Sequence, residues 1–244
     1  MSKFYEALQK NHRGKKVAGT LTSLPVPVPV ALEGASRSGL EDEMLSLYKV
    51  IESLLPDRQS KIIQFIGARE GEGTSTIIRE FAKVAADLVG HSVLLLDADR
   101  HHPSQDNFFD MPDKFGWLHS LRSEGRGGEA FHQVGDSKLF ISPGSNSAVS
   151  TPEIFNSKFE NMCQGFRGGF DWVLIDSAPL VLSPDGLAIA SKVDGIVLVV
   201  EAEKTRWQAV RTMRDSITRV GGNILGVVLN KRHYYIPESI YKYV

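Results

Sequence analysis

The fold is decided by the stretch Ile62-Ile-Gln-Phe-Ile-Gly-Ala-Arg-Glu-Gly-Glu-Gly-Thr-Ser-Thr76. It begins with an apolar run at residues 62–66 and continues as a glycine-rich loop. After the loop, residues 75–89 carry apolar side chains at helical spacing, and Gly90 follows as a stop signal. The stretch therefore predicts a buried strand, a tight loop and a long helix in direct succession.

The same alternation continues through the rest of the chain. Four more apolar runs rich in Val and Ile lie at residues 93–96, 173–175, 196–200 and 224–229, with helical patterns such as 41–55 and 205–220 around them. Runs that are apolar at nearly every position indicate strands buried on both faces. Strand–helix alternation of this kind predicts an α/β fold with a mostly parallel central sheet and helices on both faces. Only residues 107–149 are less regular, and there we expect short helices and loops.

The glycine-rich loop has the composition of a phosphate-binding loop. Glycines allow successive backbone N–H groups to turn inward, and the start of the following helix adds unpaired N–H donors and a positive dipole end. Ser75 lies where a hydroxyl group would bind Mg²⁺. We therefore predict that the loop binds ATP together with Mg²⁺ through Gly71, Glu72, Gly73, Thr74, Ser75 and Thr76.

The loop departs from the usual pattern at one position. A lysine normally stands directly before the Ser/Thr, and this chain has Thr74 there. The loss of one such charge stabiliser typically lowers a rate by about 10²–10³, whereas backbone donors and metal would still bind the nucleotide. Arg69, five residues earlier, is a candidate catalytic residue that could replace the charge. The alternative is a solvated loop arginine.

Three aspartates follow two of the other predicted strands. Asp97 and Asp99 follow the second apolar run, and Asp176 follows the third. Ligands of open parallel sheets bind outside the carboxyl ends of the strands, where the phosphate loop also opens. We predict that Asp97 and Asp176 bind Mg²⁺ with Ser75, as part of three converging carboxylates, and that Asp97 and Asp99 are catalytic. The alternative for any single aspartate is a cap on the following turn.

Composition narrows the class of protein. The chain has 244 residues, of which 42% are hydrophobic, and a formal net charge of −1, so nucleic acid is not favoured as a partner. Cys163 is the single cysteine and cannot form an internal disulfide, which suits a reducing compartment. No apolar run approaches the roughly 20 residues that cross a bilayer. The N-terminus lacks the apolar core of a signal peptide. We therefore expect a cytoplasmic protein.

We expect three regions along the chain. Residues 1–38 combine a short amphipathic helix at 3–10 with a proline-alternating stretch at 24–30, which is typical of a semi-rigid spacer or, alternatively, a proline-motif ligand. Residues 39–230 form the nucleotide-binding domain. Residues 231–244 form a tyrosine-rich tail.

Taken together, these segments resemble the bacterial tyrosine kinases (BY-kinases) of capsule and exopolysaccharide synthesis, in the deviant-Walker branch of P-loop ATPases. The resemblance covers about residues 40–244. Gly71-Glu-Gly-Thr-Ser-Thr76 resembles the family's Walker A loop. Leu95-Leu-Asp-Ala-Asp99 with Pro103 resembles its second Walker A-type motif, and Leu174-Ile-Asp-Ser-Ala-Pro179 its Walker B motif.

The resemblance implies further roles and partners. Asn230 becomes a candidate adenine contact, with a strand-end cap as the alternative. It also implies autophosphorylation of a C-terminal tyrosine cluster, here Tyr234, Tyr235, Tyr241 and Tyr243. A transmembrane polysaccharide co-polymerase, or chain-length regulator, would hold the protein at the inner face of the plasma membrane, with residues 1–30 as a candidate docking element. A homo-oligomer and a cognate tyrosine phosphatase are implied as well.

The departures from the family pattern keep other functions open. Thr74 favours an alternative in which the chain is a catalytically impaired ATP switch in the same system. Glu43, Ser46 and Lys49 stand where the family's assembly helix usually has a glutamate and two arginines, which bears on the oligomer. A partitioning or positioning ATPase is a further alternative. Such proteins carry a signature lysine at the position of Arg69 and usually lack a tyrosine-rich tail.

Overall fold

The computed structural model describes residues 28–29, 37–111, 115–118, 130–144 and 157–232. The helix expected at residues 3–10, most of the proposed docking element and all four tail tyrosines lie outside these residues. Within them the chain forms an eight-stranded sheet with the order β1-β8-β7-β2-β6-β3-β5-β4. Every neighbouring pair is parallel except β4–β5. The strands are β1 (Val28–Pro29), β2 (Lys61–Gly67), β3 (Val93–Ala98), β4 (His132–Gln133), β5 (Leu139–Ser142), β6 (Trp172–Ser177), β7 (Gly195–Glu201) and β8 (Ile224–Asn230).

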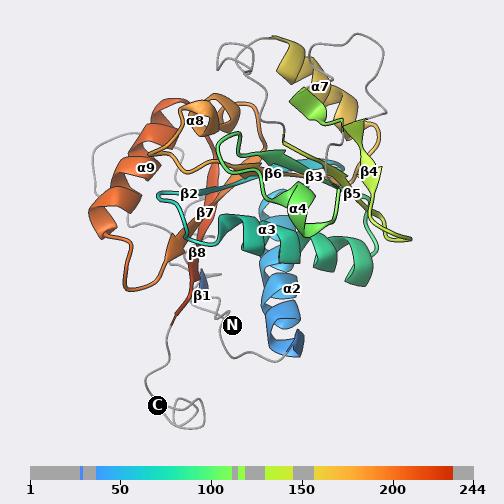
Figure 1. The fold of residues 1–244 in the computed structure, drawn as a ribbon. Coiled ribbons are helices and arrows are strands. Elements are labelled where there is room, and N and C mark those ends of the chain that lie inside the picture. The colour runs from blue at the N-terminus through green and yellow to red at the C-terminus, as the bar shows by residue number, and fades with distance from the viewer. Residues whose placement is uncertain (1–27, 30–36, 112–114, 119–129, 145–156, 233–244) are drawn as a thin grey trace.

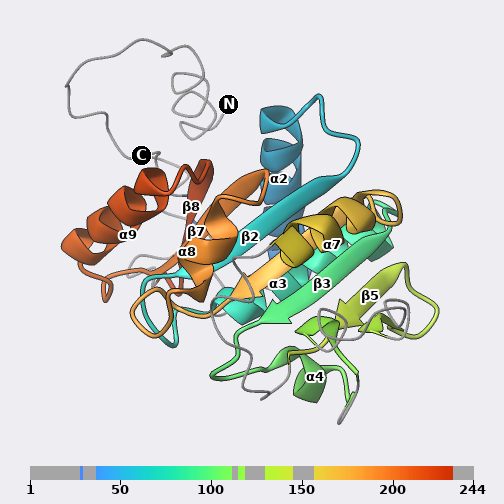
Figure 2. The ribbon, with the colours of Figure 1, turned by 90° about the horizontal axis from the view of Figure 1, so that it is seen from above.

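Helices cover both faces of this sheet, as expected. Figures 1 and 2 show α2 and α3 on one face and α7, α8 and α9 on the other. The helices are α2 (Arg37–Leu54), α3 (Thr74–Lys83), which continues as the π-helical segment η1 (Val84–Leu88), α4 (Gln105–Phe108), α7 (Ser157–Arg167), α8 (Asp185–Ala190) and α9 (Trp207–Arg219). The α/β fold with a mostly parallel sheet is therefore confirmed.

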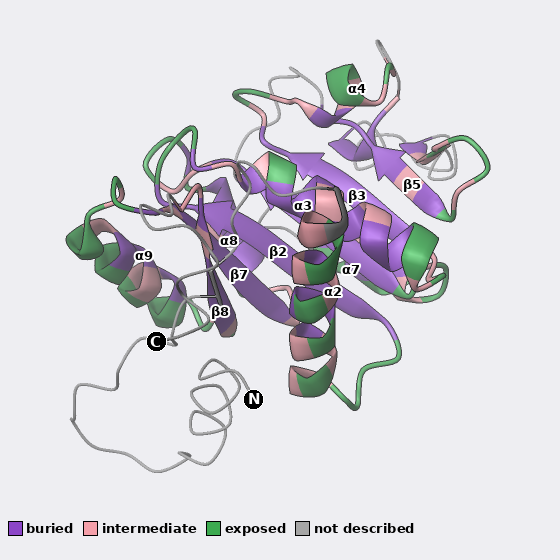
Figure 3. Cartoon of the chain, turned by 90° about the horizontal axis from the view of Figure 1, so that it is seen from below, coloured by how far each residue is buried: buried purple, intermediate pink, exposed green. Residues whose placement is uncertain are grey.

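The core consists of two apolar layers, one on each side of the sheet. Alternate residues of one strand enter opposite layers: Ile63 and Phe65 pack toward α2 and α3, whereas Ile62 and Ile66 pack toward the other helices. This follows from the period of two along a strand. Figure 3 shows buried central strands and exposed outer sides of α2 and α9. Cys163 lies in the second layer, and burial raises the pKa of its thiol to about 12, so it carries no reactive thiolate at neutral pH.

Two elements differ from the sequence expectation. Val28 and Pro29 pair with Val228 and Leu229 of β8, so this part of the proline-alternating stretch is a short edge strand rather than a free spacer. Proline is compatible with an edge strand because its missing N–H faces away from the sheet. The helix after the phosphate loop changes from α to π geometry at Val84. None of the described helices is both long and apolar enough to cross a bilayer.

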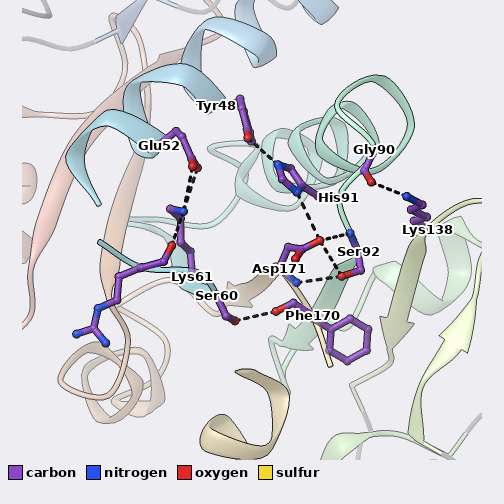
Figure 4. Close-up of polar contacts among 11 residues, drawn as sticks. Tyr48, Glu52, Ser60, Lys61, Gly90, His91, Ser92, Lys138, Phe170 and Asp171 are labelled. Carbon is purple, nitrogen blue, oxygen red and sulfur yellow. Dashed lines mark hydrogen bonds and ion pairs between the residues drawn. The ribbon is translucent and has the colours of Figure 1, made fainter. Parts of the chain in front are cut away.

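A chain of polar contacts fastens α2 to the amino ends of the strands, and Figure 4 shows its members. The Tyr48 hydroxyl lies 2.8 Å from Nε2 of His91, and His91 Nδ1 lies 3.4 Å from Oδ2 of Asp171. Nearby, Lys61 Nζ donates to Glu52 Oε1 at 3.2 Å. These groups pair with one another, so they hold the helix in place.

Candidate functional site

The phosphate loop connects β2 to α3 and is shaped by its glycines. Gly71 and Gly73 have φ values of +79° and +87°, in the left-handed region that favours glycine. A Cβ atom on Gly73 would also stand 2.2 Å from Nδ2 of Asn230. Among the described residues, no acceptor is paired with the N–H groups of Gly73, Thr74 or Ser75. The loop therefore presents free backbone donors at the start of a helix, as an anionic phosphate requires.

Glu72 stabilises this loop from inside. Its side chain is buried, and Oε2 accepts a hydrogen bond from the N–H of Arg69 at 2.9 Å. The hydroxyl of Thr205, which precedes α9, donates to Oε1 of the same carboxylate. The carboxylate is thus engaged within the protein, and the backbone N–H is the group that Glu72 can offer to a phosphate.

Asn230, the last residue of β8, lies against the same loop. Its Nδ2 donates to the carbonyl oxygen of Glu72 at 2.8 Å, and its Oδ1 accepts from the N–H of Lys231 at 2.8 Å. These hydrogen bonds connect the strand to the loop, so the contacts that Asn230 forms are those of a strand-end cap. A contact of Asn230 with adenine stays a prediction.

The two predicted metal-binding aspartates face each other across neighbouring strands. Asp97 of β3 is in direct register with Asp176 of β6, and both side chains are buried. Burial, followed by the charge of Asp176, raises the pKa of Asp97 to about 8. Burial also raises the pKa of Asp176 to about 6, against hydrogen bonds from Gln105 and Ser75 that lower it. A cation between the two carboxylates would remove this electrostatic cost.

Asp99 does not complete a cluster of three carboxylates. Its Oδ1 accepts hydrogen bonds from the N–H groups of His101 and His102, both at 3.0 Å, which closes the turn after β3. Within the part of the chain that the structure describes, no three acidic, histidine or cysteine side chains are arranged to hold a metal ion. The charge of Asp99 nevertheless contributes to the raised pKa of Asp176, and the convergence of three carboxylates on a metal ion stays a prediction. The candidate metal site consists of Asp97, Asp176 and the hydroxyl of Ser75.

Gln105 joins the parts of this site and was missed by the sequence reasoning. Its Nε2 donates to Asp176 Oδ2 at 2.7 Å and to the carbonyl of Ser75 at 3.2 Å, and its backbone N–H donates to Asp97 Oδ2 at 3.0 Å. Its Oε1 accepts from Nε of Arg79 at 3.0 Å. Gln105 lies in the irregular segment after β3, where no periodic pattern marks it.

Arg79 is the second residue that the sequence reasoning missed. It is buried on α3, one turn after Ser75, and its guanidinium carbon lies 3.7 Å from the ring centroid of Phe108. Burial lowers the pKa of Arg79, and the carboxylates of Asp176 and Asp97 act in the opposite direction. The spacing of four residues from Ser75 puts both on one helix face, a signal that could have identified Arg79.

The loop after β3 is held on the far side by an ion pair. Arg100 Nε donates to Oδ2 of buried Asp185, at the start of α8, at 2.7 Å. On the exposed side, Nδ1 of His102 lies 3.1 Å from Oε1 of Glu70 in the phosphate loop. The first contact ties the β3 loop to α8 and the second ties it to the phosphate loop, so the strand-end carboxylates and the loop lie in one site.

The residues around the missing lysine are now located. Thr74 is buried at the first position of α3, with its hydroxyl close to Gly67. Arg69 is exposed on the phosphate loop. Its role in catalysis stays a prediction, as does that of Asp99.

The site fits ATP with Mg²⁺ on three observations. The loop offers unpaired backbone N–H donors for phosphates. Asp176 Oδ1 is buried with no hydrogen-bond partner among the described residues. The hydroxyl of Ser75 reaches Asp176. Hard oxygen ligands of this kind are those that Mg²⁺ prefers.

Comparison with known proteins agrees with this geometry. No family model matches the chain. Tyrosine-protein kinase CpsD of Streptococcus agalactiae is 29% identical over 188 residues, which cover 76% of this chain and 80% of CpsD. The succinoglycan biosynthesis transport protein ExoP of Rhizobium meliloti is 28% identical over 81% of this chain and 25% of ExoP. The crystal structure of the chimerical protein CapA2B2 superposes with a TM-score of 0.78 at 21% identity, over 86% of this chain and 96% of that one.

The fold and the site together define a P-loop nucleotide-binding protein, with a phosphate loop after β2 and acidic residues at the ends of β3 and β6. The sequence motifs, which resemble those of bacterial tyrosine kinases, and the kinase relatives narrow this class of protein further. The chain is thus similar to the bacterial tyrosine kinases of capsule and exopolysaccharide biosynthesis.

Proposed function

We propose that this protein is an ATP-binding tyrosine autokinase subunit that regulates the synthesis or export of an exopolysaccharide. The observation that carries the proposal is the pair Asp97 and Asp176, buried in register beside a phosphate loop, in a chain related to tyrosine kinases. Such a pair is costly without a cation. Burial raises the pKa of both carboxyls, the charge of Asp176 also raises the pKa of Asp97, and the charge of Asp99 raises the pKa of Asp176.

The side chains have distinct roles in this proposal. Ser75, Asp97 and Asp176 would hold Mg²⁺, which neutralises phosphate charge when bound. The backbone N–H groups at the start of α3 bind phosphate oxygens, and Gln105 keeps the two carboxylates oriented. Asp97 and Asp99 are the candidates for accepting the proton of a tyrosine hydroxyl, with a tyrosine of residues 234–243 as the acceptor of the phosphoryl group.

The partner in this proposal is a transmembrane polysaccharide co-polymerase. The support is that this chain matches 25% of the length of ExoP, a protein named for transport in succinoglycan biosynthesis. A separate membrane protein would bind this chain, and the site of action would then be the inner face of the plasma membrane. Self-association and a cognate phosphatase belong to the same proposal. The three α2 residues that stand at the family's assembly positions bear on self-association. Of these, Ser46 and Lys49 are exposed and Glu43 is half-buried.

The test is incubation of the purified full-length chain with Mg·ATP, followed by mapping of phosphotyrosine by mass spectrometry. We expect phosphate on the tail tyrosines, and we expect it to vanish in Asp97→Asn while circular dichroism still reports a folded protein. Phosphate that persists in this variant would contradict the assigned site. A Tyr5→Phe variant, outside the tail, is the control that keeps the tail signal.

A second candidate function is favoured by one specific observation, the threonine at position 74. An ATP switch would bind nucleotide and change its contacts with the polysaccharide machinery without transferring phosphate. It predicts tight ATP binding without phosphotyrosine in the same experiment. If Thr74→Lys then gained autophosphorylation, the missing lysine would be the cause.

A further inference from the structure

The end of β8 holds the phosphate loop at two consecutive peptide groups. Asn230 Nδ2 donates to the carbonyl oxygen of Glu72 at 2.8 Å. Lys231 Nζ donates to the carbonyl oxygen of Gly71 at 2.7 Å. Residues 71 and 72 are about 160 positions away from these donors in the sequence, so the contact is a product of the tertiary fold alone.

These two bonds decide which way the loop amides face. In a trans peptide the C=O of one residue and the N–H of the next point in opposite directions. Because the carbonyls of Gly71 and Glu72 are held on the β8 side, the N–H groups of Glu72 and Gly73 point away from β8. Positive φ values at Gly71 and Gly73 allow this arrangement. The result is a row of donors on one side of the loop, which is the anion-binding form of such a turn.

Lys231 is itself held in an uncommon backbone conformation. Its φ is +55°, in the left-handed region, and its N–H is bound by Oδ1 of Asn230 at 2.8 Å. Such a conformation in a non-glycine residue persists where surrounding contacts over-determine it. Here those contacts direct the side chain of Lys231 toward the phosphate loop. Its ammonium group also lies 3.7 Å from Oε2 of Glu201, at the end of β7, which limits the directions it can take.

We infer that Lys231 is a positioning residue for the triphosphate. With Asn230 it pre-forms the phosphate loop, and its ammonium group places a cation on this loop, in which Thr74 stands at the position of the usual lysine. The inference rests on the proposed nucleotide binding and adds a residue to it. Lys231 acts through the loop carbonyl, from the side opposite to the phosphate-binding amides. A pre-formed loop binds more tightly because the ordering cost is met before the ligand arrives.

The test compares full-length variants that differ at one surface lysine. Lys231→Met removes the bond and the charge, and Lys231→Arg restores a charged donor. Lys204→Met is the matched control, since Lys204 pairs with the same Glu201 at 3.2 Å but its side chain is 73% exposed. Within the described part of the chain, no hydrogen bond or ion pair joins Lys204 to the phosphate loop. Affinities for Mg·ATP, Mg·tripolyphosphate and adenosine are measured by displacement of a fluorescent ATP analogue. Thermal melts check that each variant is folded.

We expect Lys231→Met to lower the affinity for Mg·ATP and Mg·tripolyphosphate about tenfold and to leave adenosine within about twofold, as expected for the loss of a charge-assisted hydrogen bond. Lys231→Arg should recover most of the loss, and Lys204→Met should match the unaltered chain. Equal losses in both methionine variants would reduce the effect to net charge and overturn the inference. An equal loss for adenosine would make Lys231 a base contact and overturn it too. Unchanged tripolyphosphate affinity in Lys231→Met would do the same. Failure of the unaltered chain to bind ATP would instead contradict the proposed function.

Discussion

Polar side chains at the two ends of the parallel sheet have opposite environments. At the amino end, Tyr48, His91 and Asp171 pair with one another, and hydrogen bonds from Ser92 lower the pKa of Asp171 in spite of partial burial (Figure 4). At the carboxyl end, Asp97 and Asp176 are buried side by side, and their pKa values are raised.

The difference separates structural polar groups from functional ones. A polar group whose charge and hydrogen bonds are matched within the protein stabilises the fold and offers little to a ligand. A carboxylate buried against another carboxylate, with Asp176 Oδ1 unpaired among the described residues, costs stability until a cation binds. Burial alone does not distinguish the two ends. The two ends differ in whether their polar groups are paired within the protein, and four experiments test this distinction.

The largest expected effect is that of Asp176→Asn. The variant removes one ligand of the candidate Mg²⁺ site, so the affinity for Mg·ATP should fall at least about 100-fold. The apo protein should be as stable as the unaltered chain or more so, because one of two buried carboxyls that are costly to ionise is gone. Calorimetric titration and thermal melts measure both. Asp171→Asn, at the amino end, is the matched control and should lose stability while keeping ATP affinity. The reverse pattern would refute the distinction.

Gln105→Met should have the next largest effect. The change keeps the volume but leaves Nε of Arg79 and Oδ2 of Asp176 without their partner. We expect a loss of about 2 kcal/mol in the free energy of unfolding and about tenfold in Mg·ATP affinity. Gln133→Met is the control, because the side chain of Gln133 is exposed and, among the described residues, bonds only to the carbonyl of Ser137. If both variants behaved alike in denaturant and in titration, Gln105 would not be the link between the two carboxylates.

A dependence of stability on pH should follow from the same pair. Raised carboxyl pKa values mean that the folded protein keeps protons that the unfolded chain releases above pH ~4. Stability of the apo protein should therefore fall as the pH rises from about 4 to about 8. Asp176→Asn should flatten this fall, and denaturant unfolding at several pH values measures it. A fall of equal size in the variant would place its source elsewhere in the chain.

Tyr48→Phe should have the smallest effect. It removes one hydrogen bond to His91 at the amino end and should lower the free energy of unfolding by about 1 kcal/mol. ATP affinity should be unchanged, because no ligand contact is lost. Urea unfolding and ATP titration provide the two readouts. A clear loss of affinity would mean that the amino end is coupled to the site and that the two ends are not independent.

Much of the fold could be predicted from local patterns. The apolar runs at 62–66 and 224–229 lie within β2 and β8, which extend them by one residue at one or both ends. Such runs are reliable because burial on both faces leaves no position for a polar side chain. The helix expected at 41–55 begins earlier, at Arg37, since its first turn lacks a strong start signal. The edge strand at Val28–Pro29 was not predicted, because pairing with β8 is a distant contact.

By itself the sequence determined the order of strands and helices along the chain, the glycine-rich loop between β2 and α3, and the acidic residues at the strand ends. These are local properties of composition and spacing. Only the tertiary structure decided that Asp97 stands opposite Asp176, that Asp99 closes a turn, and that Gln105 and Lys231 reach the site. The reason is that strand order, register and contacts between distant residues arise from packing of the whole sheet, which no local pattern encodes.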